Sequence, residues 1–314
     1  MTKQHLMVLG AATLLALGTQ AVAFDEIPFE QLPQETVIER PTRALAYGHG
    51  AIWAVSGYDF VRIDASTSEE VKTDTKTVTW FRPIAISDTA VWLAHVKGNT
   101  LYKFDPKSAE TQLEIPIEIA WAQTTMAFGD GAVWLLTVGQ EKQVAQVLSA
   151  IEIDTGILRS ALELPSQSYG VAFANDSVWV TSSTLHELYK VDISANEIVT
   201  TTPLGRRPGP VVFGQGSLWV HNQGDGTVQR IDPSSGSITA TIETPLPSGD
   251  SITVFGGGFL WLTPVKGSPL IQIDPAANSV VRSYVGAKPT GLAYGDGSVW
   301  LSETSRILRL ALPD

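Results

Sequence analysis

The sequence predicts an all-β fold, a seven-bladed β-propeller built from four-stranded blades. One pattern occurs seven times and aligns without gaps: AYGHGAIWAV, AISDTAVWLA, AFGDGAVWLL, AFANDSVWVT, VFGQGSLWVH, VFGGGFLWLT and AYGDGSVWLS. Each copy carries one tryptophan, and neighbouring copies are 39 to 45 residues apart: Trp53, Trp92, Trp134, Trp179, Trp219, Trp261 and Trp300. Repeats of about 40 residues that each contain four short strands are typical of propeller blades.

The fifth unit illustrates the four strands. GPVVF leads through the turn GQG into SLWVH, in which apolar and polar residues alternate as in a half-buried strand. A polar loop, NQGDG, precedes TVQRID, and the turn PSSG precedes SITATIET. Glycine-containing turns at this rhythm connect antiparallel strands of one sheet.

The seventh unit stops after its third strand, ILRLAL. A strand is predicted over Thr36–Arg40, directly before the first strand of the first blade, where every other unit has its fourth strand. We expect it to pair with Ile307–Leu312. This pairing would complete the seventh blade and remove an open sheet edge.

Three segments are predicted along the chain. Residues 1–23 contain an apolar stretch of 13 residues and end in Ala21-Val22-Ala23, the small-x-small pattern of a signal-peptidase site. We therefore expect a signal peptide cleaved after Ala23 and a periplasmic or secreted protein. Residues 24–35 are acidic and contain two prolines, which predicts a linker or flexible arm. The propeller is expected over residues 36–314.

The composition of the chain limits the kinds of partner that it is expected to bind. The chain has no cysteine and a net charge of −11, so its stability must come from a core rather than disulfides. The acidic balance argues against nucleic acid as a partner. No segment after residue 23 is long and apolar enough to insert into a membrane. We expect a monomer.

Two repeated residue types are assigned structural roles. The seven tryptophans are expected to pack between adjacent blades. Six aspartates end third strands in turn contexts such as DPSSG, where a carboxylate accepts hydrogen bonds from backbone N–H groups: Asp64, Asp105, Asp154, Asp192, Asp232 and Asp274.

One face of the propeller should carry the long loops, namely those between second and third strands and those between blades; we call it the loop face. Binding residues concentrate on such loops. The predicted ligand-binding residues are basic side chains of the blade-to-blade segments: Arg43, Arg82, Arg206, Arg207 and Lys288. Because arginine suits carboxylate and phosphate, we expect an acidic small molecule or an acidic segment of a protein partner at this face.

Histidines are few. His95 and His221 are predicted in the same loop of blades two and five, facing each other across the central channel. The sequence contains no clustered His, Asp and Glu motif that predicts a metal site. In blade three the segment VGQEKQVAQVLSA lengthens the loop by seven residues relative to the other blades, and this insertion would either cover the channel mouth or project without a role.

The units GLAYGDGSVWLS…ILRL and GPVVFGQGSLWVH…TVQRIDPSSGSITATI resemble bacterial seven-bladed propellers of the virginiamycin B lyase-like and YVTN type. The resemblance covers about residues 36–314. It implies an exported propeller and, for the lyase, metal-assisted elimination by a histidine and glutamates. The lyase unit commonly reads WFTE, and only WLSETSRILRL, with Glu303, comes close here. The other blades have Ser56, His95, Thr137, Ser182, Asn222 and Pro264 at that position.

Two functions follow as hypotheses. The first is a binding or scaffold module, not an enzyme, that recognises an acidic ligand at the loop face and needs no cofactor. The second is a carbon–oxygen lyase of the virginiamycin B type. In it His221 or His95 would be the base and Glu303 would hold Mg²⁺, giving His221, His95 and Glu303 as the catalytic candidates.

Overall fold

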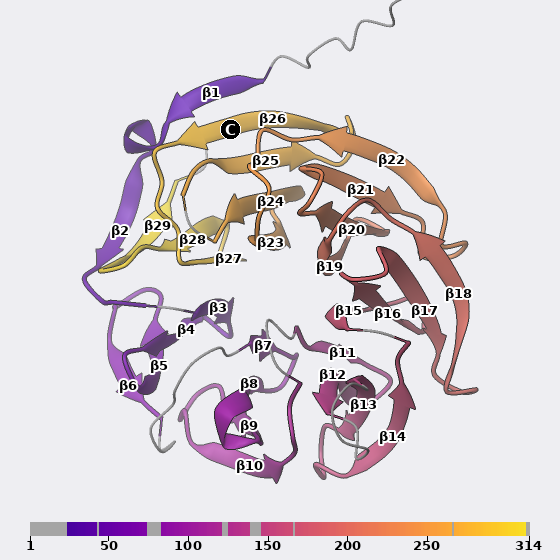
Figure 1. Cartoon of the computed structure of the whole chain (residues 1–314). Helices are drawn as coiled ribbons and strands as arrows, with labels where there is room; N and C mark the ends of the chain where they lie inside the picture. Colours follow the sequence, from indigo (N-terminus) through magenta and orange to yellow (C-terminus); the bar gives the residue numbers. More distant parts are fainter. Residues whose placement is uncertain are drawn as a thin grey trace, which may run out of the picture.

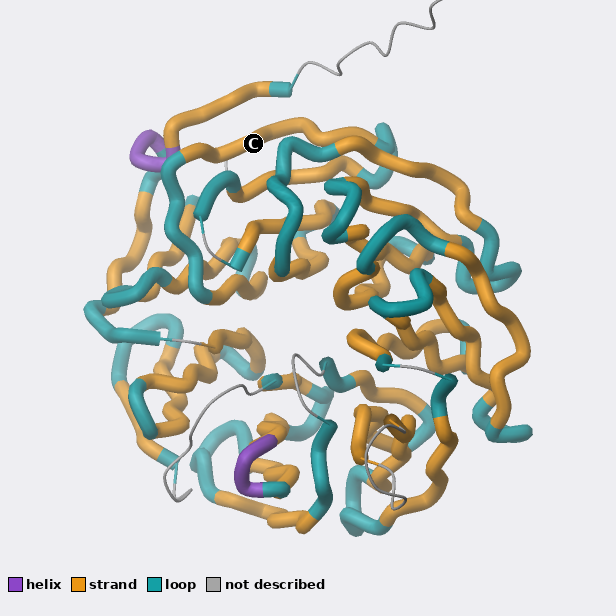
Figure 2. Tube along the Cα trace, in the orientation of Figure 1, coloured by secondary structure: helices purple, strands orange, loops and turns teal. Residues whose placement is uncertain are grey.

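The structure, a computed structural model, is a ring of seven β-sheets around a central axis (Figure 1). It describes residues 24–42, 44–73, 83–120, 125–138, 146–165, 167–265 and 267–311. The predicted all-β seven-bladed propeller is confirmed. Helix in the described part of the chain is limited to two short 3-10 turns, η1 (Phe29–Gln31) and η2 (Val96–Gly98) (Figure 2). No helix among these residues has the length and apolar character needed to cross a membrane. The predicted signal peptide, residues 1–23, lies outside the described residues.

Each blade is an antiparallel meander that runs outward from the axis. The innermost strands are β3 (Ala44–Gly48), β7 (Ile84–Ile86), β11 (Ala127–Gly129), β15 (Ser168–Ala174), β19 (Pro208–Gly214), β23 (Ser251–Gly256) and β27 (Gly291–Gly295). The second strands are β4 (Ala51–Ser56), β8 (Val91–His95), β12 (Ala132–Val138), β16 (Ser177–Ser182), β20 (Ser217–Asn222), β24 (Phe259–Pro264) and β28 (Ser298–Ser302).

The outer half of each blade is more exposed. The third strands are β5 (Asp59–Asp64), β9 (Thr100–Phe104), β13 (Gln146–Glu152), β17 (Glu187–Asp192), β21 (Thr227–Ile231), β25 (Leu270–Asp274) and β29 (Ile307–Leu310). The fourth strands are β6 (Glu70–Lys72), β10 (Thr111–Pro116), β14 (Leu158–Glu163), β18 (Glu197–Pro203), β22 (Ile238–Glu243), β26 (Ser279–Val285) and, for blade seven, β2 (Gln34–Ile38).

The ring closes by pairing the two ends of the chain. β2 is antiparallel to β29, with Thr36 opposite Arg309 and Ile38 opposite Ile307. The predicted N-terminal strand is therefore confirmed, although it begins at Gln34 and ends at Ile38. Because the fourth strand of blade seven comes from the other end of the sequence, opening the ring requires breaking a whole β-ladder.

The prediction of a linker over residues 24–35 is wrong. β1 (Asp25–Pro28) pairs in parallel with β26 and gives blade six a fifth strand. Phe29 and Leu32 are buried in a cluster with residues of blades six and seven. The acidic residues face solvent while the apolar ones between them pack inward, and β26 otherwise presents an unpaired edge to which a strand can add.

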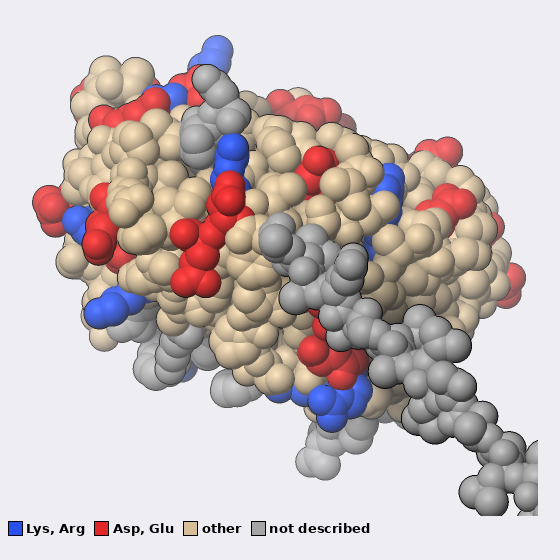
Figure 3. Space-filling model, turned by 90° about the horizontal axis from the view of Figure 1, so that it is seen from above, with Lys and Arg blue, Asp and Glu red and all other residues tan. Residues whose placement is uncertain are grey.

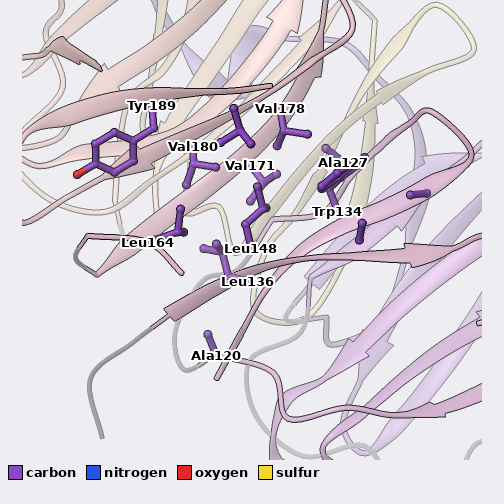
Figure 4. Close-up of a cluster of buried hydrophobic side chains, with 13 residues drawn as sticks. Ala120, Ala127, Trp134, Leu136, Leu148, Leu164, Val171, Val178, Val180 and Tyr189 are labelled. Carbon is purple, nitrogen blue, oxygen red and sulfur yellow. The ribbon is translucent and has the colours of Figure 1, made fainter. Parts of the chain in front are cut away.

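The seven repeated tryptophans are the largest fully buried side chains, and the prediction that they pack in the core is confirmed. The clusters around them span neighbouring blades, as between blades three and four, where Trp134 and Leu136 meet Val171 and Val180 (Figure 4). Five of the indole N–H groups donate to the carbonyl at the end of the first strand, as Trp219 does to Gly214 at 3.1 Å. Burial and hydrogen bonding thus orient these five indoles.

A cation covers the outer side of most of these indoles. In register with Trp219 on the neighbouring strand lies Arg230, whose guanidinium sits 5.1 Å from the ring centroid and donates to the carbonyl of Pro275 in blade six at 2.9 Å. Lys103 and Lys190 likewise lie over Trp92 and Trp179. Their ammonium groups donate to backbone carbonyls of the next blade, those of Ile153 and Ser234. These three side chains tie their blades to the next one.

Glycine at the end of a first strand makes room for the neighbouring blade. A Cβ on Gly295 would overlap the ring of Tyr47, and a Cβ on Gly256 would overlap the ring of Tyr294. Gly48, Gly129 and Gly214 lie in the same way beneath Ile86, Phe173 and Phe255. The recurring Tyr-Gly and Phe-Gly pairs of the repeat are therefore the two halves of one contact between blades.

The aspartate turns are confirmed in five blades; Asp232, for example, accepts the backbone N–H of Ser234 at 2.8 Å. Blade three differs, because Glu152 rather than Asp154 lies in register with Ala132 at the end of the third strand. The insertion in this blade is thus five residues by strand register, not seven. Residues 139–145 lie outside the described part of the chain.

We predict that Gly295→Val lowers the free energy of unfolding by about 2 kcal/mol, because the added methyl groups must displace the ring of Tyr47 from a close-packed interface. Urea unfolding followed by tryptophan fluorescence measures the change. Thr201→Val, on the exposed side of the outer strand β18, is the matched control and should change the value by less than about 0.5 kcal/mol. Equal stability of Gly295→Val and the parent would contradict this role of the glycine.

Candidate functional site

The seven innermost strands enclose a channel of about 1640 Å³ along the propeller axis. One equivalent residue of each blade lines this channel; in six blades it lies in the first strand opposite the residue after the repeated tryptophan, and in blade three it directly precedes the first strand. These seven residues are Leu45, Ile84, Met126, Val171, Val211, Thr253 and Leu292. Six are apolar, so the channel is a predominantly apolar cavity.

Aromatic side chains lie at both ends of the channel. Tyr58, in the loop between β4 and β5, and Tyr169, at the start of β15, lie at the loop face. Phe173 and Phe213 lie at the opposite end, next to the short turns. Tyr58 is 63% exposed and Phe213 is 41% exposed, so apolar surface is available at each opening.

A rigid group of loops borders the loop-face mouth at blades four to six. The connection between β18 and β19 lies along the loop after β20, where Gln223 N–H donates to Arg207 O and Gly224 N–H donates to Arg206 O, each at 2.9 Å. Arg206 also donates through Nε to Asp225 at 2.6 Å. A Cβ on Gly205 would overlap Asn222 and Asp225, so only glycine permits this close approach.

Arg207 joins this group to blade six. Its guanidinium donates to Asp250 at 3.2 Å, and its backbone N–H donates to Nδ1 of His186 at 3.1 Å. Arg207 and His186 both adopt left-handed backbone conformations, with φ of 51° and 60°, which cost energy for residues other than glycine. The loop holds Arg207 in this conformation beside the channel.

Tyr169 lies next to this ion pair and lines the channel. Burial raises the pKa of its hydroxyl above the usual value, the charge of Asp250 raises it further, and a hydrogen bond to Gln223 and the charge of Arg207 oppose the rise. Tyr169 is therefore a neutral hydrogen-bonding group at the mouth.

His221 is a buried residue of β20 rather than a loop residue. Its Nδ1 lies 2.6 Å from Ser251 Oγ across the interface with blade six, and its Nε2 has no hydrogen-bond partner among the described residues. Burial lowers the pKa of the imidazole to about 4. His221 is neutral at physiological pH.

The structure does not bring the three predicted catalytic residues together. His95 ends β8 in blade two and its ring stacks on Tyr102, with centroids 6.5 Å apart. Glu303, after β28 in blade seven, accepts from Arg306 Nε at 2.8 Å and from the backbone N–H of Lys288 at 3.4 Å.

The expectation that His95 and His221 face each other across the channel is wrong. His221 is two residues after its tryptophan and His95 is three, so on strands with period two their side chains project from opposite sides of their sheets.

Magnesium does not fit these residues. The predicted donors belong to three different blades, two, five and seven; Nδ1 of His221 contacts Ser251 and the Glu303 carboxylate accepts from Arg306. Among the described residues, no three His, Cys, Asp or Glu side chains are grouped as metal ligands would be. No catalytic step through a metal is derived.

Of the predicted ligand-binding residues, Arg206 and Arg207 come together, whereas exposed Lys288 lies in the connection to blade seven. Arg43 and Arg82 lie outside the described residues. Four loop-face arginines pair with carboxylates: Arg40 with Glu70, Arg206 with Asp225, Arg207 with Asp250 and Arg306 with Glu303. On the side shown in Figure 3, acidic and basic side chains are likewise interspersed.

Sequence reasoning missed Tyr169, Gln223, Ser251 and Thr253. Tyr169 and Ser251 occur in the blade-to-blade segments SQSYGVA and SGDSITV, which contain no basic residue to indicate a site. Thr253 carried a usable signal, because its aligned neighbours in the other six blades are all apolar.

No family model matches this chain, and no curated protein matches it. Solved structures match its fold. A streptogramin B lyase has a TM-score of 0.73 and 17% identity, over 88% of this chain and 95% of that chain. Virginiamycin B lyase from Staphylococcus aureus has a TM-score of 0.72 and 17% identity, and the match covers 88% of this chain and 99% of that chain. A catalytically inactive variant of that enzyme with quinupristin has a TM-score of 0.72 and 18% identity, and the match covers 90% of this chain and 99% of that chain. The resemblance to virginiamycin B lyase-like propellers is confirmed at the level of the fold.

We predict that stability falls as the pH drops from about 6.5 toward 4. In this window the unfolded chain protonates residue 221 while the folded protein keeps it neutral, so the unfolded state binds more protons and folding weakens with acid. The loss approaches about 3 kcal/mol at pH 4 and is absent above pH 7. Urea unfolding at several pH values measures it.

His221→Gln should flatten this pH dependence, whereas the control His49→Gln, at an exposed histidine of a short turn, should retain it. Parallel pH profiles for the parent and His221→Gln would contradict the assignment.

Proposed function

We propose that this protein is a binding module that takes a small molecule with an apolar body into the central channel from the loop face. An acidic group of the ligand contacts Arg207 at the mouth. The observation that carries the proposal is the apolar wall formed by equivalent positions of all seven blades around about 1640 Å³.

An apolar body suits the wall. Six of the seven ring positions are aliphatic or methionine, and Tyr58 adds exposed aromatic surface at the entrance. Removing about 300 Å² of ligand surface from water contributes about 7 kcal/mol before the cost of association. A concave, mainly apolar cavity with a few polar groups at one end is the usual form of a small-molecule site.

An acidic group suits the mouth. The Arg207–Asp250 pair is about half exposed, so it contributes little to stability and can exchange partners. A ligand carboxylate would accept from the Arg207 guanidinium and from the Tyr169 hydroxyl. Lys288, Arg43 and Arg82 belong to the same proposal as further positive charges of the loop face.

A lyase of the virginiamycin B type is the alternative, since the similar solved structures bear that name. It would require His95 or His221 as base beside a magnesium ion on Glu303. The placement of these residues in three blades favours binding over elimination. Export through residues 1–23 and a monomeric state remain part of the proposal.

Titration with 11-(dansylamino)undecanoic acid tests the proposal, because dansyl fluorescence rises when the probe leaves water. We expect saturable binding that weakens about fivefold in Tyr58→Ser and about tenfold in Arg207→Glu, through loss of apolar contact and reversal of charge. Added salt should weaken binding to the parent more than to Arg207→Glu.

Two control variants match these changes on the outside of the ring. Ile157→Ser removes a similarly exposed apolar side chain, and Lys72→Glu reverses an exposed charge on β6; neither should alter the titration. The proposal would be overturned if binding were not saturable, or if the two control variants weakened it as much as Tyr58→Ser and Arg207→Glu.

A further inference from the structure

One of the seven equivalent residues that line the channel is polar. Where the other blades have Leu45, Ile84, Met126, Val171, Val211 and Leu292, blade six has Thr253. Its hydroxyl is buried and has no hydrogen-bond partner among the described residues. A buried hydroxyl without a partner costs about 1–3 kcal/mol, whereas valine, present in blades four and five, would avoid that cost.

A second hydroxyl lies on the same side of β23. Ser251 is two residues before Thr253, so their side chains point the same way along the strand, about 6.6 Å apart at the backbone. Both residues line the channel. Rotation about χ1 of Thr253 gives the hydroxyl a second direction, in the place now taken by the methyl group or the hydrogen on Cβ.

His221 sets the proton arrangement of Ser251. Because an orphaned buried N–H is rarer than an orphaned acceptor, the proton of the neutral imidazole belongs on Nδ1, which donates to Ser251 Oγ at 2.6 Å. Nε2, which has no partner in the described part of the chain, is then the bare acceptor. The Ser251 hydroxyl keeps its own proton, so Ser251 and Thr253 are two neutral donors in an apolar wall.

These donors suit an uncharged carbonyl oxygen, which accepts two hydrogen bonds. A carboxylate is unfavourable at this depth because no described cation compensates its desolvation there. The cation lies one step outward, since Arg207 pairs with Asp250, the residue directly before Ser251. Going outward from the channel, the site therefore suits a ligand that has first an uncharged carbonyl and then, next to it, an acidic group.

We infer that the ligand is an N-acyl amino acid. Its acyl chain lies in the channel, its amide carbonyl accepts from Ser251 and Thr253, and its carboxylate meets Arg207. In such a molecule only the amide nitrogen and the α-carbon separate the carbonyl from the carboxylate, so the two groups are close enough to contact Ser251 and Arg207, the partner of the adjacent Asp250. This inference rests on the proposed function and specifies its ligand.

Competition against 11-(dansylamino)undecanoic acid at pH 7.5 tests the inference with two acids of equal chain length. N-decanoylglycine has an amide, and tridecanoic acid has methylene groups in its place. We expect the parent protein to bind N-decanoylglycine about fivefold more tightly, although it is the less apolar acid, as two neutral hydrogen bonds allow.

Thr253→Val and Ser251→Ala should each weaken N-decanoylglycine about three- to fivefold and leave tridecanoic acid unchanged. The matched control is Leu292→Val, at the equivalent ring position of blade seven, and it should affect both acids equally. Thr253→Val introduces the residue of blades four and five, so the fold is retained.

The outcomes separate the two proposals. If both acids bind equally, or if Thr253→Val and Ser251→Ala leave the preference for the amide intact, the carbonyl site is overturned while the binding function stands. If neither acid displaces the probe and the probe itself does not bind, the proposed function fails as well.

Discussion

The packing of one tryptophan per blade against its neighbouring blade is the interaction on which the rest of this structure depends. Each four-stranded sheet has two faces and could not bury both alone, so the blades must cover one another in a ring. The indole fills the space between blades, its N–H is anchored on the first strand in five blades, and a cation from the third strand often reaches over it to the next turn. Glycines beneath the neighbouring aromatic rings permit the same close approach near the axis.

A ring held together by such pairwise contacts must also close. The chain achieves this twice, with β2 completing blade seven and β1 adding to the edge of blade six, while Phe29 and Leu32 fill the space between them. Residues near the N-terminus thus contact the last two blades. Closure holds the seven inner strands around the axis and so maintains the channel.

The candidate site lies where blades four to six differ from the pattern that the other blades repeat. On the loop face, the loops of blades four to six contain two non-glycine residues in left-handed conformations, His186 and Arg207, a glycine-dependent close approach and an ion pair between blades. The buried His221–Ser251 contact and the unpaired hydroxyl of Thr253 lie in the adjoining wall. Buried polar groups without partners are costly, and their concentration beside an apolar channel is what suggests a ligand with one polar and one apolar part.

The sequence by itself determined the fold, the blade count, the core tryptophans and the terminal closure, because each depends on short periodic patterns repeated seven times. It also identified Arg206, Arg207 and His221 as residues of interest. It could not determine that Arg207 pairs with Asp250, that His221 is buried against Ser251, or that His95 and Glu303 lie far from it in the ring of blades. These facts depend on side-chain direction and on contacts between units some 40 residues apart. Likewise, the acidic segment 24–35 looked like a linker because its role depends on the free edge of β26. Only the tertiary structure brings that edge and that segment together.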